Sequence, residues 1–290
     1  MRSRFRFLLV PAMLLSILIL ASCNKVKLDQ MVSQIRVEKI AEKNDQLFLF
    51  NGKNAVILRN NSAIAEFGGV QVVLPDRVFR DNNGVWHLAM RSVEIVNRVI
   101  NPVRNRVNTI VIDPGHGGKD PGALSVTRKN REKALNLDLA LRLGSALQNA
   151  GFTVLYTRND DSTVALEKRG TAFQADLFVS IHHNSSSNIS ASGAETFCLM
   201  SDRKKVDDKI LNAVNIAVSV QKNQSSASGT YGRGVKFANF RVLRDAECPA
   251  ILFETGFISN PDDEKKCLSV QWRQLMADAL AKGIIQAVSL

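Results

Sequence analysis

Histidines and acidic residues follow three short apolar runs in this chain, each at the point where the run ends. One run ends just before Asp113 and His116, the next ends at His182, and the last ends at Glu254. Each run has the length and the β-branched or aromatic content of a buried strand. Ligand sites in open α/β sheets lie beyond the carboxyl ends of the strands. The pattern therefore predicts a hydrolytic metal site at one sheet edge. The runs cover residues 107–112, 177–181 and 250–253.

The residue types are those of a catalytic zinc centre, which takes three ligands from His, Asp or Glu and leaves one position for water. His116 and His182 are two candidate ligands, and Glu132 is a candidate for the third. Glu132 also fits a simple capping charge, because a helix dipole favours an acidic residue in the first turn. His116 lies in a glycine-rich turn, where Asp113 is expected to orient its ring, and an exposed turn histidine is the alternative.

Two further positions leave alternatives open. His182 and His183 must point to opposite sides of a strand, so only one of them faces the site. Glu254 ends an apolar run, where a carboxylate is costly unless it is paired or used. It fits a general base beside the metal, or else a salt bridge to Arg241 or Arg244.

The elements that position these residues alternate between strand and helix from residue 107 onward. Leucines at every fourth position predict a helix over 130–149. Further helices are expected at 164–173, 205–220 and 272–288, and further strands at 153–157, 196–200 and 242–243. This alternation predicts an α/β fold over 107–290, with a mixed, largely parallel sheet flanked by helices on both faces.

The segment before residue 107 has a different character. Residues 47–100 carry short strand-like runs, two of them around the turn signal Asn51-Gly52, and predict a small β-rich module. Residues 23–46 are polar and are expected to form a tether, and residues 101–106 a linker.

The composition is that of a globular protein: 290 residues, 45% hydrophobic and 22% charged, with a formal net charge of +11. A basic surface favours polyanions, but no nucleic-acid-binding motif is present, so nucleic acid is not an expected partner. The cysteines at 198, 248 and 267 lack the paired spacing of a thiolate zinc site. We expect Cys198 and Cys248 to be small buried residues in strands.

The first 22 residues predict a targeting signal. Three arginines precede an apolar stretch that is about the length of a signal-peptide core and short for a spanning helix. The tetrad ending at Cys23 resembles a bacterial lipobox, which implies cleavage before Cys23 and lipid attachment to its sulfur. An ordinary secretory signal with a chance cysteine is the alternative. Removal of Arg2, Arg4 and Arg6 would leave a net charge of +8.

Residues 107–289 resemble the zinc-dependent N-acetylmuramoyl-L-alanine amidases of the amidase-3 family. The resemblance implies that His116, Glu132 and His182 bind a single catalytic Zn²⁺ and that Glu254 is the catalytic acid/base. In the family, the position of His183 usually holds a small residue. Asp113, His183 and Asn184 are expected to support the ligands, and Arg169 falls on a family position with a structural role. Four blocks match in order, at residues 111–123, 175–182, 233–244 and 249–260.

The implied activity is hydrolysis of the amide between N-acetylmuramic acid and L-alanine in peptidoglycan. With the lipobox, this predicts a protein in the cell envelope, lipid-anchored to a membrane and facing the periplasm. Residues 199–232 leave no room for a long inhibitory helix, so no obligatory activator is expected. Two alternatives are a wall-binding lipoprotein without catalysis, and a zinc peptidase that cuts within the stem peptide.

Overall fold

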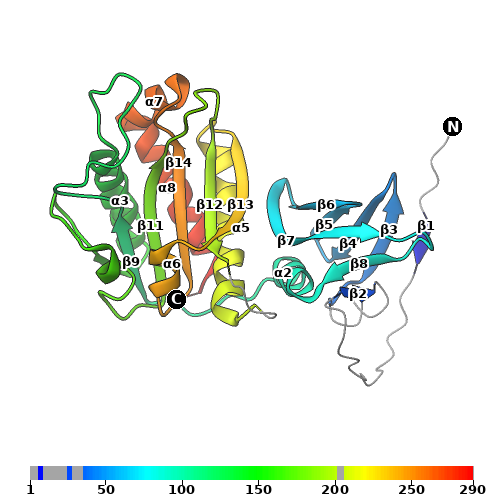
Figure 1. The fold of residues 1–290 in the computed structure, drawn as a ribbon. Helices are drawn as coiled ribbons and strands as arrows, with labels where there is room; N and C mark the ends of the chain where they lie inside the picture. The colour runs from blue at the N-terminus through cyan, green and yellow to red at the C-terminus, as the bar shows by residue number, and fades with distance from the viewer. Residues whose placement is uncertain (1–5, 9–24, 28–34, 201–205, 290) are drawn as a thin grey trace. The chain divides into compact units, whose positions relative to one another are not determined.

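The computed structural model describes residues 6–8, 25–27, 35–200 and 206–289 (Figure 1). The chain divides into two compact units, with the main boundary between Pro102 and Val103. This boundary falls within the predicted linker. The predicted lipidation site, Cys23, lies outside the described residues. No helix in the described part of the chain combines the length and the apolar character needed to cross a membrane.

The first unit is an antiparallel meander covered by one helix, α2 (Met90–Ile100). Alternate residues such as Val56 and Leu58 are fully buried, because one face of the meander packs against the apolar side of α2. Two short strands, β1 (Arg6–Leu8) and β2 (Lys25–Lys27), pair with β3 and β8. The main strands are β3 (Lys39–Lys43), β4 (Gln46–Asn51), β5 (Asn54–Arg59), β6 (Ser62–Phe67), β7 (Val70–Arg80) and β8 (Trp86–Ala89).

The β-rich module predicted for residues 47–100 is present, with two differences. Its strands begin earlier, because β3 and the start of β4 lie within the stretch expected to be a tether. Its last eleven residues form α2, whose buried Val93, Val96 and Ile100 follow a helical spacing. The hairpin predicted at Asn51-Gly52 is confirmed, since β4 and β5 pair up to Asn51 and Asn54 and Gly52 has a φ of +54°.

The second unit is built on a six-stranded sheet with the strand order β13-β12-β14-β11-β9-β10. Every neighbouring pair is parallel except β12 and β14, so β12 and β13 run opposite to the other four strands. This confirms the predicted mixed, largely parallel sheet. The strands are β9 (Thr109–Pro114), β10 (Thr153–Tyr156), β11 (Leu177–Asn184), β12 (Ala194–Leu199), β13 (Gly232–Ala238) and β14 (Ala250–Phe257).

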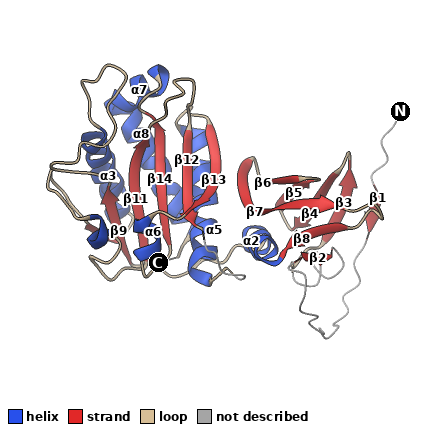
Figure 2. Cartoon of the chain, viewed as in Figure 1, coloured by secondary structure: helices blue, strands red, loops and turns tan. Residues whose placement is uncertain are grey.

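Helices cover both faces of this sheet (Figure 2). One face is packed by α3 (Glu132–Asn149), α5 (Asp208–Ala227) and α8 (Val270–Ala287). The other face carries two short helices, α4 (Leu166–Arg169) and α6 (Arg241–Asp245). A further helix, α7 (Pro261–Leu268), follows β14. The predicted leucine periodicity is confirmed in α3, where Leu135, Leu139, Leu143 and Leu147 are all buried.

Two local predictions for this unit are wrong, and two elements were not predicted. Residues 242–243, expected to be a strand, lie in α6, where Val242 and Leu243 pack into a buried cluster with Val111 and Phe178. Two apolar residues between charged neighbours are too few to separate strand from helix. Cys248 lies outside any strand and is half-buried, whereas Cys198 and Cys267 are buried, and all three thiols are free. Strand β13 and helix α7 were not expected.

Candidate metal centre and catalytic site

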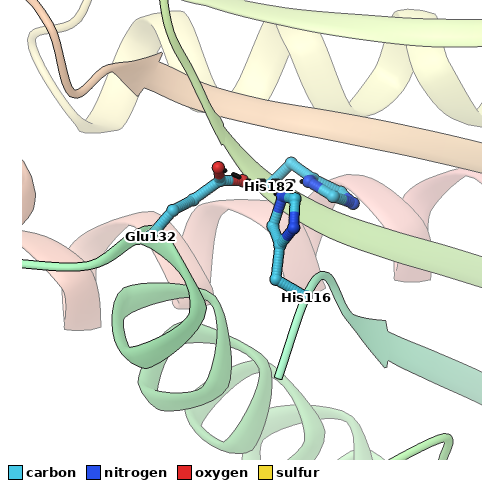
Figure 3. Close-up of side chains that lie close together, drawn as sticks. All are labelled: His116, Glu132 and His182. Carbon is cyan, nitrogen blue, oxygen red and sulfur yellow. Dashed lines mark hydrogen bonds and ion pairs between the residues drawn. The ribbon is translucent and has the colours of Figure 1, made fainter. Parts of the chain in front are cut away.

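Three of the predicted site residues converge in the second unit: His116, Glu132 and His182 (Figure 3). They come from the turn after β9, the first residue of α3 and the end of β11. His116 Nε2 lies 3.1 Å from Glu132 Oε2, and His182 Nδ1 lies 2.9 Å from Glu132 Oε1. One ligand atom from each residue lies within 4.8 Å of the others. The three side chains are therefore close enough to share one metal ion.

The turn that carries His116 has an unusual backbone, held by two buried arginines. His116 has a φ of +62°, which a residue with a Cβ adopts only at a cost. Arg158 donates to the carbonyl oxygens of Pro114 and Gly115 at 2.9 and 2.8 Å. Arg169 donates to the carbonyl oxygens of Pro114 and His116 at 2.9 and 2.6 Å. The arginines thus donate to three consecutive carbonyl oxygens of the turn, and so hold it in this conformation.

Asp120, rather than Asp113, contacts the ring of His116. His116 Nδ1 lies 2.7 Å from Asp120 Oδ2, and a carboxylate only accepts, so Nδ1 donates and Nε2 is left for a metal. The prediction that Asp113 orients this ring is wrong. Asp113 is fully buried inside the sheet edge and acts on the turn only through Arg169. It accepts hydrogen bonds from the side chains of Thr157, Arg169 and Ser180.

Glu132 is fixed in place by hydrogen bonds to both of its carboxylate oxygens. Its Oε2 accepts from the backbone N–H of Ala123, and its Oε1 from the backbone N–H of His183 and the amide of Asn136. Burial alone would raise the pKa of Glu132. Hydrogen bonds to His116 and His182 outweigh the effect of burial and hold this pKa far below its ordinary value. Glu132 is therefore an anion in a nearly water-free position.

The two histidines show the electrostatic effect of this anion. Burial alone would lower the pKa of His116, but hydrogen bonds to Glu132 and Asp120 raise it to about 9. The pKa of His182 is raised as well, with burial opposed by its hydrogen bond to Glu132. The site thus attracts positive charge, and two imidazoles with one carboxylate are a known ligand set of catalytic zinc. The residues fit a divalent metal.

Glu254 lies beside this cluster. The parallel register of β11 and β14 pairs His182 with Glu254, so the two side chains share one face of the sheet. Glu254 Oε2 is buried and has no hydrogen-bond partner among the described residues. Burial raises the pKa of Glu254 to about 7. The alternative salt bridge is absent, since Arg241 and Arg244 both pair with Asp245.

The remaining predicted residues lie one layer further out. His183 points away from the His-Glu-His cluster and toward α3, where its Nδ1 lies 2.7 Å from Asn136 Oδ1. Burial lowers its pKa to about 4, so this imidazole is neutral. Asn184 donates through Nδ2 to Glu195 at 2.8 Å rather than to a ligand.

Glu195 was not predicted, although it lies next to Glu254 in the antiparallel register of β12 and β14. It is 4% exposed and forms ion pairs with Arg233 and Lys236. The sequence signal that could have revealed Glu195 is an acidic residue inside the strand-like sequence 194–199. Asn136, which is fully buried in α3 and bonds Glu132, was also missed as a functional residue.

Comparison with known proteins places these residues in a family. Residues 110–286 match the family model described as N-acetylmuramoyl-L-alanine amidase. The amidase LytC of Bacillus subtilis (strain 168) is 30% identical over 248 residues, which cover 84% of this chain and 46% of LytC. The probable cell wall amidase LytH of Staphylococcus saprophyticus is 33% identical over 200 residues, 69% of this chain and 64% of LytH. The chain thus spans about half to two thirds of the length of these relatives.

Solved structures agree with the sequence comparison. The catalytic domain of CwlV, an N-acetylmuramoyl-L-alanine amidase from Bacillus (Paenibacillus) polymyxa var. colistinus, superimposes with a TM-score of 0.56 at 34% identity, covering 62% of this chain and 97% of that domain. The CwlD amidase from Clostridioides difficile, solved in complex with the GerS lipoprotein, gives a TM-score of 0.56 at 28% identity, over 62% of this chain and 98% of CwlD. With the family model spanning residues 110–286, this chain belongs to the N-acetylmuramoyl-L-alanine amidase family.

Proposed function

We propose that this protein is a zinc-dependent enzyme that hydrolyses the amide between N-acetylmuramic acid and L-alanine in peptidoglycan and releases stem peptides. The proposal is carried by one observation: Glu254, with a buried and unpartnered Oε2, lies beside His182 of the His-Glu-His cluster. A free carboxyl group next to a metal centre is the arrangement that metal-assisted hydrolysis requires.

His116, Glu132 and His182 would hold the zinc, the ligand set that the sequence resemblance implies. When bound, zinc supplies a Lewis acid that activates water and polarises the amide carbonyl. The chain itself fixes the direction of each ligand. Asp120 sets the tautomer of His116, and backbone N–H groups and Asn136 hold the carboxylate of Glu132.

Glu254 moves the proton. Its pKa of about 7, set mainly by burial, is that of a group that can both accept and donate a proton near neutral pH. We assign to it the proton of the attacking water, which it then passes to the nitrogen of the leaving L-alanine. The bond between the lactyl carbonyl carbon and that nitrogen breaks, which leaves a free lactyl carboxylate on the glycan and a free amine on the peptide.

The test is Glu254→Gln, which keeps the size of the side chain and removes the proton carrier. We expect zinc content equal to that of the wild type and release of stem peptides from purified sacculi reduced at least 100-fold. A chelator should stop the wild-type enzyme and added Zn²⁺ should restore it. Release by the variant at the wild-type rate would refute the role of Glu254.

Mass spectrometry of the released fragments separates the candidate activities. An amidase leaves a lactyl carboxylate on the sugar, whereas a peptidase would cut inside the stem peptide. A wall-binding protein without catalysis would bind sacculi and release neither product. The four residues His116, Glu132, His182 and Glu254 together favour the amidase.

The location and the control of activity are also proposals. Attachment of lipid to Cys23 would anchor the enzyme in the cell envelope, facing the periplasm, with peptidoglycan as its partner. Loss of membrane association in Cys23→Ser would support this anchor.

We further propose activity without an obligatory partner, since the only helix described between residues 199 and 232 is α5, which packs against the sheet and α8. The CwlD amidase was solved in complex with the GerS lipoprotein, so the direct test is whether the purified protein is active without any added partner.

A further inference from the structure

We propose that Lys236 forms a carboxylate subsite beside the catalytic centre, which receives the free α-carboxylate of the second stem residue. This inference rests on the proposed function and adds the recognition of the peptide side of the bond. It is built on a row of charged side chains that crosses the sheet of the second unit and ends in an excess of positive charge.

The row begins at the metal cluster and follows strand pairing. His182 on β11 pairs with Glu254 on β14, and Glu254 pairs with Glu195 on β12. Paired residues direct their side chains to the same face, so these three lie in line on one side of the sheet. Strands β11, β14, β12 and β13 lie side by side in Figure 1. With about 4.8 Å between strands, Glu195 lies about 10 Å from His182 along the row.

Glu195 contacts two cationic side chains, one more than is needed to balance the charge of its carboxylate. Its Oε2 accepts from Arg233 Nε at 2.7 Å and also from Lys236 Nζ, and its Oε1 accepts from the amide of Asn184. A single cation would balance this buried carboxylate. Two cations leave a net charge of +1, and both side chains are partly open to solvent, at 30% for Arg233 and 27% for Lys236.

The two cations differ in how firmly they are held. Arg233 also donates to the carbonyl oxygen of Ser192, and its guanidinium lies 5.0 Å from the centre of the Phe257 ring. Lys236 donates only to Glu195 among the described residues, and its Nζ lies 6.0 Å from the Phe197 ring. Lys236 keeps donors that a ligand can use, so the structure assigns the subsite to Lys236 and the support of Glu195 to Arg233.

The position of negative charge in the substrate indicates which part of it would bind Lys236. On the glycan side of the scissile amide the sugar and the lactyl group are uncharged before cleavage. On the peptide side, the second residue is joined through its side-chain carboxyl group and carries a free α-carboxylate unless it is amidated. Two extended residues span about 7 Å, so a peptide that starts between His182 and Glu254 reaches the cations at the end of the row. An acidic second residue should therefore bind better than its amide.

The test compares two product tripeptides by calorimetry on the zinc-loaded full-length protein: L-alanyl-γ-D-glutamyl-L-lysine, and the same peptide with the α-carboxyl group of its second residue as an amide. We expect the acid to bind about 10-fold more tightly than the amide, as for a hydrogen bond between charged groups. Lys236→Met should abolish this preference and Lys236→Arg should keep it. Lys222→Met, an exposed lysine on α5, is the matched control and should keep the wild-type preference.

Two results would overturn the subsite: equal affinity of the wild-type protein for both peptides, or an undiminished preference in a folded Lys236→Met variant. The wild-type comparison needs no variant, so it decides even where the substitution disturbs folding. Because binding is measured without turnover, the outcomes also separate the two proposals. An enzyme that cleaves the muramoyl amide but binds both peptides equally refutes the subsite alone. A protein that prefers the acid but cleaves nothing refutes the proposed activity alone.

Discussion

Gly115→Ala is the change that most directly tests the position of His182. A Cβ at residue 115 would lie 2.2 Å from Cε1 and 2.3 Å from Nε2 of the His182 ring. Carbon atoms in contact are about 3.5 Å apart, so the ring or the turn must move by more than about 1 Å. The φ of Gly115 lies outside the left-handed region, so the cost is a clash with the ring rather than backbone strain.

A shift of this size is large for a metal site. Zinc–nitrogen distances are held within about 0.2 Å of 2.0–2.1 Å, and disturbed support of a ligand typically weakens metal affinity 10- to 100-fold. We expect at least a 10-fold loss of Zn²⁺ affinity in Gly115→Ala, measured by competition with a chromophoric chelator. Forced packing should also lower the free energy of unfolding of the chelator-treated protein by about 1–3 kcal/mol.

Gly229→Ala is the matched control. Gly229 has a φ of +64° and nothing within 4 Å of an added Cβ, so alanine there adds backbone strain of about 1–2 kcal/mol without touching the site. Its Zn²⁺ affinity should equal that of the wild type. If Gly115→Ala also binds Zn²⁺ as tightly as the wild type, the reasoning that makes His182 a ligand in this geometry is refuted.

Three further predictions concern the surroundings of the ligands. Asn136→Ala removes one buried hydrogen bond each from Glu132, the Gly115 carbonyl oxygen and His183, and should cost about 2 kcal/mol in denaturant unfolding; an unchanged midpoint would contradict this. His183 has a folded-state pKa of about 4 against 6.5 unfolded, so only the unfolded chain binds its proton between these values. His183 alone should therefore withdraw about 3 kcal/mol of stability from the chelator-treated protein as the pH falls from 6.5 to 4, while protonation of Glu254, whose pKa burial raises to about 7, adds stability over the same range. The measurement is therefore the difference between the two proteins: His183→Gln should gain about 3 kcal/mol relative to the wild type over this fall in pH. Arg169→Lys reaches fewer of the three acceptors on Asp113 and the turn, and should weaken Zn²⁺ binding about 10-fold; wild-type affinity would show that the turn needs no such support.

Much of the site follows from local sequence. The apolar runs before His116 and Glu254 are long enough to be recognised as strands, and strand polarity brings their ends to one edge. The leucine spacing fixes α3 and thus the position of Glu132 at its start. The choice between His182 and His183 was different, because alternation along β11 says only that one of them faces the site. The family resemblance was needed to choose.

What the sequence did not reveal depends on register and turn geometry. Glu195 lies next to Glu254 only because β12 runs antiparallel to β14, and nothing local to residue 195 specifies that pairing. Asp113 and Asp120 are equally plausible partners for His116 in sequence. The positive φ of His116 and the sheet contacts of Asp113 decide between them. Helix α7 did carry a usable signal, since Asn260 accepts from the N–H groups of Asp262 and Asp263 and Pro261 follows it.

The origin of the ligands in three separate segments has a consequence for the loop between the first two. An ion held by His116 and Glu132 would cross-link the chain across residues 117–131 and restrict that loop much as a short disulfide does. The loop carries exposed Arg128, Lys129 and Arg131, the residues after which trypsin cuts. Metal loading would therefore also govern how long the protein survives among proteases, so that the copies without metal are the ones removed first.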